Sequence, residues 1–237
     1  MTINILMNTD KNMIDACKVV INSILANTEE PVKFHIMGTV FKHDKANIIF
    51  YSIPNLECLP QIRQNGHITK IAVCRLFAPY IKTLDKVLYI DCDTVVLSDI
   101  KELWDIPVEY IKGVLDPMYI SNAKKNNLGT STYINSGVLL MNLKALREIP
   151  YFDMMMKTQS HGYNLSLLDQ DIINIAFKNY IELLPYEWNV YAKIYSETTQ
   201  EMLEVRNNPK IIHWCGYEKP WNCETVWKRE EWLKYAE

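Results

Sequence analysis

The sequence predicts one α/β domain with a central, mostly parallel sheet flanked by helices. Short apolar runs alternate along the chain with stretches whose apolar residues recur at helical spacing, which is the rhythm of β-α-β units. The chain has 237 residues, a length that suits a single large domain, so we assign residues 1–237 to one domain. Hydrophobic residues make up 49% and charged residues 22%, which is typical of a globular protein.

Apolar runs bounded by polar residues predict the first elements. The runs at 3–7 and 32–37 indicate two buried strands. Between them, apolar residues recur at helical spacing over 13–25, which predicts a helix. We expect a second helix over 43–51, broken before Pro54.

The same alternation continues through the rest of the chain. A partly helical stretch, limited by Pro79, precedes an apolar strand that runs directly into Asp91. The expected elements are a partial helix over 67–82, strands at 87–90, 113–115, 138–141 and 210–214, and helices over 169–177 and 224–235.

Composition excludes several classes of function. The chain carries 25 basic and 28 acidic side chains, so we expect no nucleic-acid partner, because neutralising phosphates needs a basic surface. It has 7 glycines and lacks both G-x-G-x-x-G and the P-loop pattern, which disfavours a dinucleotide-binding Rossmann enzyme and a P-loop NTPase.

Targeting signals and cysteine spacing predict the compartment. No cleaved signal sequence and no stretch of 18 apolar residues is recognisable, so we expect a cytoplasmic protein with at most a peripheral contact at the inner membrane face. The 6 cysteines show no C-x-x-C spacing, which favours free thiols over disulfides or a zinc site.

An acidic pair, Asp91-x-Asp93, follows the apolar strand at 87–90. Ligands of open α/β sheets bind outside the carboxyl ends of strands. Two neighbouring carboxylates are costly unless a positive charge lies between them, and Mn²⁺ or Mg²⁺ can bind both carboxylates and phosphate oxygens. Acidic loop residues after strands are also common without a metal, so the pair alone predicts a metal site only weakly.

A second segment, 213–221, carries residues that would complete such a site. Its strand delivers His213, Gly216 allows a close backbone approach, and Lys219 lies next to Pro220 and Trp221. A neutral imidazole can ligate a metal, and a lysine can meet a diphosphate as a point charge. A lone histidine at a strand end is more often ordinary, so the prediction depends on the combination.

Six segments of the chain form an ordered set of motifs: 8–12 (NTDKN), Arg75-Leu76, 88–96 (LYIDCDTVV), 135–143 (NSGVLLMNL), 169–171 (DQD) and 213–221 (HWCGYEKPW). Taken together, these motifs resemble those of the retaining glycosyltransferases of family 8, which include glycogenin and bacterial lipopolysaccharide α-galactosyl- and α-glucosyltransferases. The resemblance implies a GT-A fold, a UDP-glucose or UDP-galactose donor, Mn²⁺ (with Mg²⁺ as the alternative cation) and a glycan, lipid-linked or protein acceptor. It also suggests a role in bacterial polysaccharide biosynthesis.

The resemblance further assigns roles to individual positions. The metal ligands would be Asp91, Asp93 and His213. The nucleotide-sugar contacts would be Asn8, Asp10, Asn12, His67, Arg75, Cys92, Gly216 and Lys219. The residues around the transferred sugar would be Asn135, Asp169 and Gln170, with Asp116 toward the acceptor. Lys11 and Met13 differ from the acidic and aromatic residues common in the family, so contacts to the base could differ.

The mechanism that the resemblance implies is transfer with retention of the α configuration. Gln170 matches the candidate nucleophile, and an amide is a poor one, so a front-face route is favoured, in which the leaving phosphate oxygen takes the acceptor proton. Asp169 is the alternative nucleophile, or else it orients sugar hydroxyls.

Other functions remain open at this stage. The 14 tyrosines allow a self-glycosylating primer like glycogenin. A non-catalytic nucleotide-sugar-binding protein is a second alternative. A metal-dependent phosphohydrolase is a third, although its usual additional acidic and histidine clusters are missing.

Overall fold

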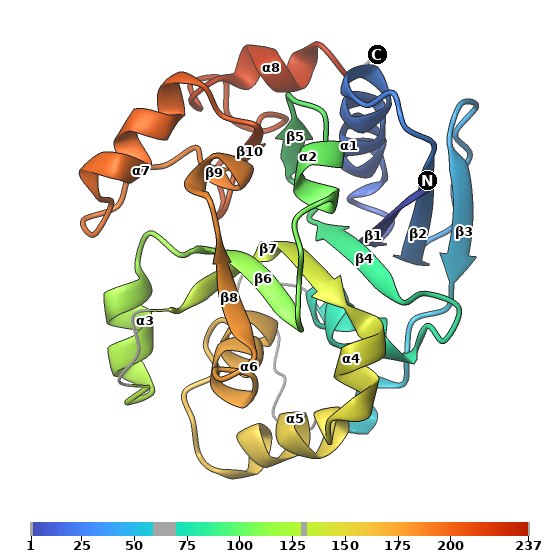
Figure 1. The fold of residues 1–237 in the computed structure, drawn as a ribbon. Helices are drawn as coiled ribbons and strands as arrows, with labels where there is room; N and C mark the ends of the chain where they lie inside the picture. The colour runs from blue at the N-terminus through green and yellow to red at the C-terminus, as the bar shows by residue number, and fades with distance from the viewer. Residues whose placement is uncertain (1, 59–69, 129–131, 237) are drawn as a thin grey trace.

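A seven-stranded sheet organises the computed structural model, which describes residues 2–58, 70–128 and 132–236 (Figure 1). The strand order is β3-β2-β1-β4-β7-β6-β8. β7 runs antiparallel to both of its neighbours and all other pairings are parallel, which confirms the predicted mostly parallel sheet. The strands are β1 (Ile3–Thr9), β2 (Val32–Gly38), β3 (Asn47–Tyr51), β4 (Lys86–Ile90), β6 (Ile111–Leu115), β7 (Ile134–Asn142) and β8 (Ile181–Leu184).

Helices cover both faces of this sheet, and the shorter ones join its strands (Figure 1). The α-helices are α1 (Ile14–Asn27), α2 (Lys101–Trp104), α3 (Tyr119–Lys125), α4 (Leu143–Glu148), α5 (Tyr151–Ser160), α6 (Asp169–Ala176), α7 (Gln200–Glu204) and α8 (Arg229–Leu233). The 3₁₀ helices are η1 (Leu56–Cys58), η2 (Lys70–Tyr80), η3 (Tyr186–Trp188) and η4 (Val205–Asn207).

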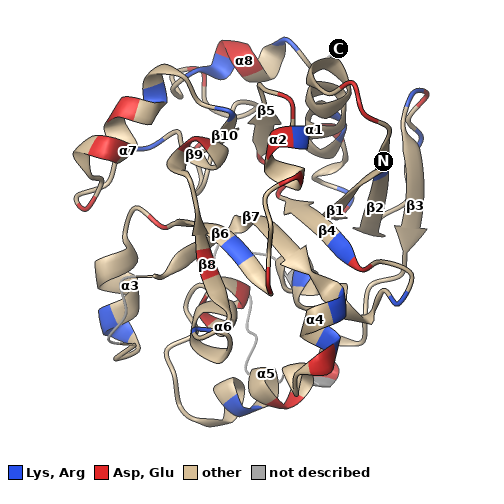
Figure 2. Ribbon diagram, viewed as in Figure 1, with Lys and Arg blue, Asp and Glu red and all other residues tan. Residues whose placement is uncertain are grey.

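The central strands are apolar because both of their faces are buried. In β4, Val87 and Tyr89 pack with residues of η2, α5 and α6 on one face. Leu88 and Ile90 pack with residues of α1 and α2 on the other. Figure 2 shows the corresponding distribution of charged residues: β1 and β7 carry none, and most charged residues lie on helices and loops.

A small second sheet brings the two halves of the chain together. It has the order β5-β10-β9, formed by β5 (Thr94–Val96), β9 (Val190–Tyr191) and β10 (Ile211–His213). His213 pairs with Thr94 on one side and with Tyr191 on the other. The backbone N–H of Trp214 donates to the carbonyl oxygen of Asp93 at 3.0 Å. This pairing places His213 next to the acidic loop, although more than 100 residues separate them.

Two predicted elements differ from the structure. The predicted helix over 43–51 is wrong: residues 47–51 form β3, parallel to β2. The run Ile-Ile-Phe-Tyr at 48–51 has β-branched and aromatic side chains that suit a strand, and a short apolar run does not separate the two states by periodicity. The terminal helix is also shorter than predicted, because Lys228 adopts a left-handed conformation (φ 55°) and α8 begins only at Arg229.

Membrane spans and the state of the cysteines were also predicted from the sequence. No helix within them combines the length and the apolar character needed to cross a membrane. Cys17, Cys74, Cys92, Cys215 and Cys223 are free thiols.

Candidate active site

Three parallel strands of the large sheet deliver polar residues to one cavity. Because β1, β4 and β6 run in the same direction, their carboxyl ends meet at one edge of the sheet, where ligands of such sheets bind. Asn8, Asp91 and Asp116 lie at these ends and line a cavity of about 550 Å³. The other walls come from η2, β7, α6 and the segment after β10.

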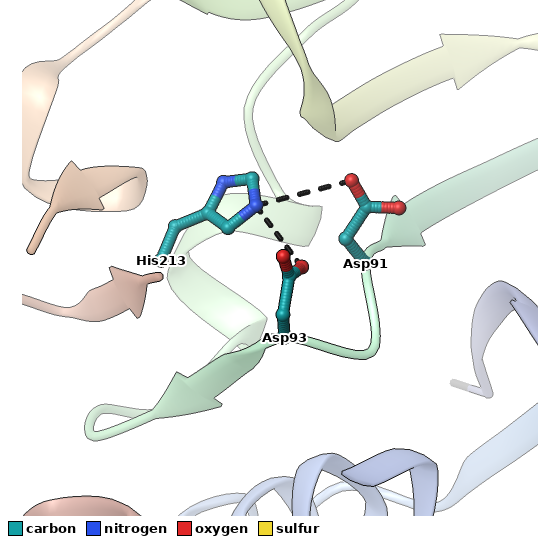
Figure 3. Close-up of side chains that lie close together, drawn as sticks. All are labelled: Asp91, Asp93 and His213. Carbon is teal, nitrogen blue, oxygen red and sulfur yellow. Dashed lines mark ion pairs between the residues drawn. The ribbon is translucent and has the colours of Figure 1, made fainter. Parts of the chain in front are cut away.

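Asp91, Asp93 and His213 converge at this cavity, and their potential ligand atoms all lie within 4.8 Å of one another (Figure 3). The Nε2 atom of His213 is 3.1 Å from Oδ1 of Asp93 and 3.9 Å from Oδ2 of Asp91. Two carboxylate oxygens and one imidazole nitrogen form a donor set that a divalent cation of intermediate hardness accepts. The residues present therefore fit a metal site with positions left for other ligands.

Lys219 supplies a positive charge beside this group. Its ammonium pairs with Oδ2 of Asp93 and also donates to the backbone oxygen of Trp214. Burial alone would raise the pKa of Asp93, but Lys219 and His213 hold that pKa well below its usual range. Asp93 therefore keeps its negative charge at any pH at which the protein would be assayed.

Arg75, from η2, joins the metal group to the neighbouring acidic residue of α6. Its guanidinium is 2.9 Å from Oδ1 of Asp91 and 3.0 Å from Oδ2 of Asp169, and its side chain is only 4% exposed. It also donates to the backbone oxygen of Ala72 at 2.9 Å, and it lies over the ring of Tyr89. This one cation thus fixes two carboxylates that face the cavity.

One carboxylate oxygen of Asp169, Oδ2, is held in this arrangement. Besides the contact with Arg75, its Oδ2 accepts a hydrogen bond of 2.9 Å from the hydroxyl of Ser136. Burial raises the pKa of Asp169 to about 6, against the opposing effect of Arg75. A carboxylate held by a guanidinium and a hydroxyl is suited to orienting a ligand, and it is less available as a nucleophile.

Gln170, Asn135 and Asp116 form a connected chain of hydrogen bonds. The Gln170 amide donates to Oδ2 of Asp116 at 3.1 Å and accepts from the Asn135 amide at 2.8 Å. Tyr191 also donates to Oδ2 of Asp116, at 2.9 Å. Burial raises the pKa of Asp116, whereas the backbone N–H of Met118 and the Tyr191 hydroxyl lower it. The amide of Gln170 is thereby fixed at the cavity wall.

Of the other residues named from the sequence, some line the cavity and others do not. Gly216 lines the cavity with φ of 94°, a conformation that favours glycine. Cys92 lines it as well, and its thiol donates to the backbone oxygen of Asn8 at 3.1 Å. Asp10 and Asn12 form a turn in which the Asn12 N–H donates to the Asp10 carboxylate at 2.8 Å, and neither lines the cavity. His67 lies outside the described residues.

The cavity and supporting residues that were not assigned from the sequence include Tyr89, Ser136, Asn189 and Tyr191. Tyr89 donates to Asp91 at 2.6 Å, and Ser136 contacts both Arg75 and Asp169. These two lie inside the matching motifs, so their positions could have marked them. Asn189 and Tyr191 lie in no motif, and the pairing of β9 with β10 alone brings them to the site.

Comparison with known proteins identifies the family. The model of glycosyl transferase family 8 matches residues 4–225 of the chain. The chain belongs to glycosyltransferase family 8. This match covers every residue discussed above as a site residue, and it confirms the resemblance found in the motifs.

Relatives of this family 8 chain include proteins named for glycosyl transfer. It is 32% identical over 191 residues to General stress protein A of Bacillus subtilis, covering 73% of this chain and 66% of that protein. It is 26% identical over 268 residues to a lipopolysaccharide 1,2-glucosyltransferase of Escherichia coli, covering 99% of this chain and 77% of the relative.

A solved structure confirms the fold of this family 8 member. The galactosyltransferase LgtC, in complex with donor and acceptor sugar analogs, superposes with a TM-score of 0.82 at 25% identity. The superposition covers 99% of this chain and 95% of LgtC. The expected GT-A fold is therefore confirmed.

Proposed function

We propose that this family 8 protein transfers glucose or galactose from a UDP-sugar to a glycan, a lipid-linked sugar or a protein, with Mn²⁺ as its cation. The observation that carries the proposal is the convergence of Asp91, Asp93 and His213 on a cavity that also holds Lys219. Cation and lysine together suit a diphosphate, because both neutralise negative charge on phosphate oxygens. The names of the glucosyltransferase relative and of LgtC support a hexose donor.

Different residues of the chain would have different roles in the transfer. A cation held by Asp91, Asp93 and His213 would supply electrophilic stabilisation of the charge that develops on the diphosphate leaving group. Lys219 adds a second positive charge on the same side of the cavity. Asn8 lines the cavity at the end of β1, where it offers a buried side-chain oxygen that has no partner among the described residues. Contacts of Asp10 and Asn12 to the uridine remain part of the proposal.

The surroundings of the candidate nucleophiles support a front-face route with retention. The Gln170 amide accepts from Asn135 and from the Ser136 N–H, so its oxygen is occupied. Oδ2 of the Asp169 carboxylate is held by Arg75 and Ser136. These contacts make both groups poorer nucleophiles and favour a front-face route, in which the leaving phosphate oxygen would take the acceptor proton.

A donor panel tests this function. UDP-glucose, UDP-galactose and UDP-N-acetylglucosamine would be incubated with the protein, with and without Mn²⁺, and hydrolysis would be followed. We expect turnover only with Mn²⁺ and for one hexose, and Asp93→Asn should lower it by about 100-fold or more. Asp105→Asn is the matched control, because Asp105 is an exposed aspartate that pairs with Lys101 and does not line the cavity. Near wild-type turnover in Asp93→Asn would overturn the metal role.

The same incubation separates the alternatives. Intact-protein mass spectrometry would show an increase of one or more hexoses if the protein were a self-glycosylating primer. Binding of a UDP-sugar without any hydrolysis or transfer would indicate a non-catalytic binding protein.

A further inference from the structure

The buried side chain of Asn189 lies directly behind the candidate metal ligand His213. Oδ1 of Asn189 is 2.9 Å from Nδ1 of His213, on the opposite side of the ring from the Nε2 atom that faces Asp91 and Asp93. Asn189 is 3% exposed and His213 is also 3% exposed, so water does not compete for this contact. Asn189 follows η3 and directly precedes β9, which pairs with the strand that carries His213.

Two backbone N–H groups of β7 determine which way the amides in this region point. The Gly137 N–H donates to Oδ1 of Asn135 at 2.8 Å, and the Ser136 N–H donates to Oε1 of Gln170 at 3.3 Å. A backbone N–H can only donate, so the oxygen of each amide must face the backbone. The NH₂ group of Asn135 therefore faces Gln170, and that of Gln170 faces Asp116.

The orientation of Asn135 then fixes Asn189. Oδ1 of Asn135 accepts from the NH₂ group of Asn189 at 2.8 Å, which turns the oxygen of Asn189 toward His213. An amide oxygen can only accept, so Nδ1 of His213 must carry the proton and donate it. In the neutral imidazole, the form that binds a metal, the lone pair available for a cation is consequently on Nε2.

We infer that Asn189 is a positioning residue that holds His213 as its Nδ1–H tautomer and so directs Nε2 toward the cation shared with Asp91 and Asp93. Hydrogen bonds to the far nitrogen of a metal-bound histidine orient the ring, and removing such a partner typically lowers metal affinity 10–100-fold. The same chain of amides ends at Gln170 and Asp116, so one network orients both the metal ligand and the wall of the sugar site. The inference rests on the proposed metal site.

Two substitutions at Asn189 separate its acceptor role from simple packing. Asn189→Leu keeps the approximate volume but offers no acceptor to Nδ1–H. Asn189→Asp keeps an acceptor for Nδ1–H but cannot donate to Oδ1 of Asn135. Asn189→Ala is the replacement for Asn189→Leu if that variant does not fold, since it also removes the acceptor.

Titration of the metal-free protein with Mn²⁺ alone, followed by the electron paramagnetic resonance signal of free Mn²⁺, measures affinity without any turnover. We expect Asn189→Leu to bind Mn²⁺ about 10–100-fold more weakly than wild type, and Asn189→Asp to stay within about threefold. The melting temperature of each variant in EDTA shows whether its metal-free fold is as stable as that of the wild type. Equal losses of Mn²⁺ affinity in both variants, or wild-type Mn²⁺ affinity in Asn189→Leu, would overturn the positioning role of Asn189. Neither result would contradict the metal site itself. If the wild-type protein binds no Mn²⁺, the proposed function fails and this inference fails with it.

Discussion

Replacing Arg75 by methionine should destabilise the protein strongly, because it leaves the buried carboxylate of Asp169 and the partly buried carboxylate of Asp91 without their shared cation. The guanidinium contacts Asp91 at 2.9 Å and Asp169 at 3.0 Å, and the side chain is 4% exposed. Breaking a buried ion pair by removing one partner costs about 3–5 kcal/mol. With a typical urea dependence of about 2–3 kcal/mol per molar, the unfolding midpoint should fall by roughly 1–2.5 M.

Urea unfolding in the presence of EDTA, followed by circular dichroism, measures this loss without metal. Lys101→Met is the matched control, because Lys101 pairs with Asp105 at the surface and such pairs contribute less than about 1 kcal/mol. The double substitution Arg75→Met with Asp169→Asn should recover part of the loss, since one of the two unpaired carboxylates is then neutral. A midpoint for Arg75→Met equal to that of Lys101→Met would refute the central position given to Arg75.

Two further predictions concern histidines. Burial, aided by Lys33, lowers the pKa of His35 from 6.5 to about 4, and its ring nitrogens contact Tyr51 and Asn4 at 2.9 and 3.1 Å. Because the folded pKa is depressed, the stability that His35 contributes is complete above pH 6.5 and is lost as pH falls toward 4. We expect that loss to be about 2 kcal/mol at pH 4.5. Urea unfolding at pH 7 and pH 4.5 should show this loss reduced in His35→Phe relative to wild type, and an identical pH dependence would count against it. Gly137→Ala should lower Mn²⁺ affinity at least about tenfold, because a Cβ atom there would lie 2.2 Å from Cε1 of His213 and force the ring to move. Calorimetric titration with Mn²⁺ checks this, and unchanged affinity would contradict the close packing of His213 on β7.

The grouping of Asp91, Asp93 and His213 could be predicted from the sequence because these residues lie in short local patterns. Asp91 and Asp93 follow an apolar strand, and His213 ends another. The central strands were also predictable, since burial on both faces requires continuous apolar runs. β3 was not, because its run of apolar residues suits either a helix or a strand, and pairing with β2 decides the outcome.

The contacts that hold the site residues in place could not be predicted from sequence patterns. Asn189 lies 24 residues before His213 and in no motif, and only the pairing of β9 with β10 brings the two together. Arg75 was named as a nucleotide-sugar contact, but its simultaneous contacts with Asp91 and Asp169 depend on how η2 packs against α6. Such contacts arise from tertiary packing, which local spacing does not encode.

The most direct test of the proposed metal site is to locate the cation itself. Crystals of the protein grown with MnCl₂ and UDP would be measured near the manganese absorption edge, where anomalous scattering identifies the metal. We expect one strong anomalous peak within coordination distance of Asp91, Asp93 and Nε2 of His213, with the UDP diphosphate bound to the same ion. A diphosphate bound without an anomalous peak at these three residues, or a peak elsewhere in the cavity, would contradict the proposed metal site.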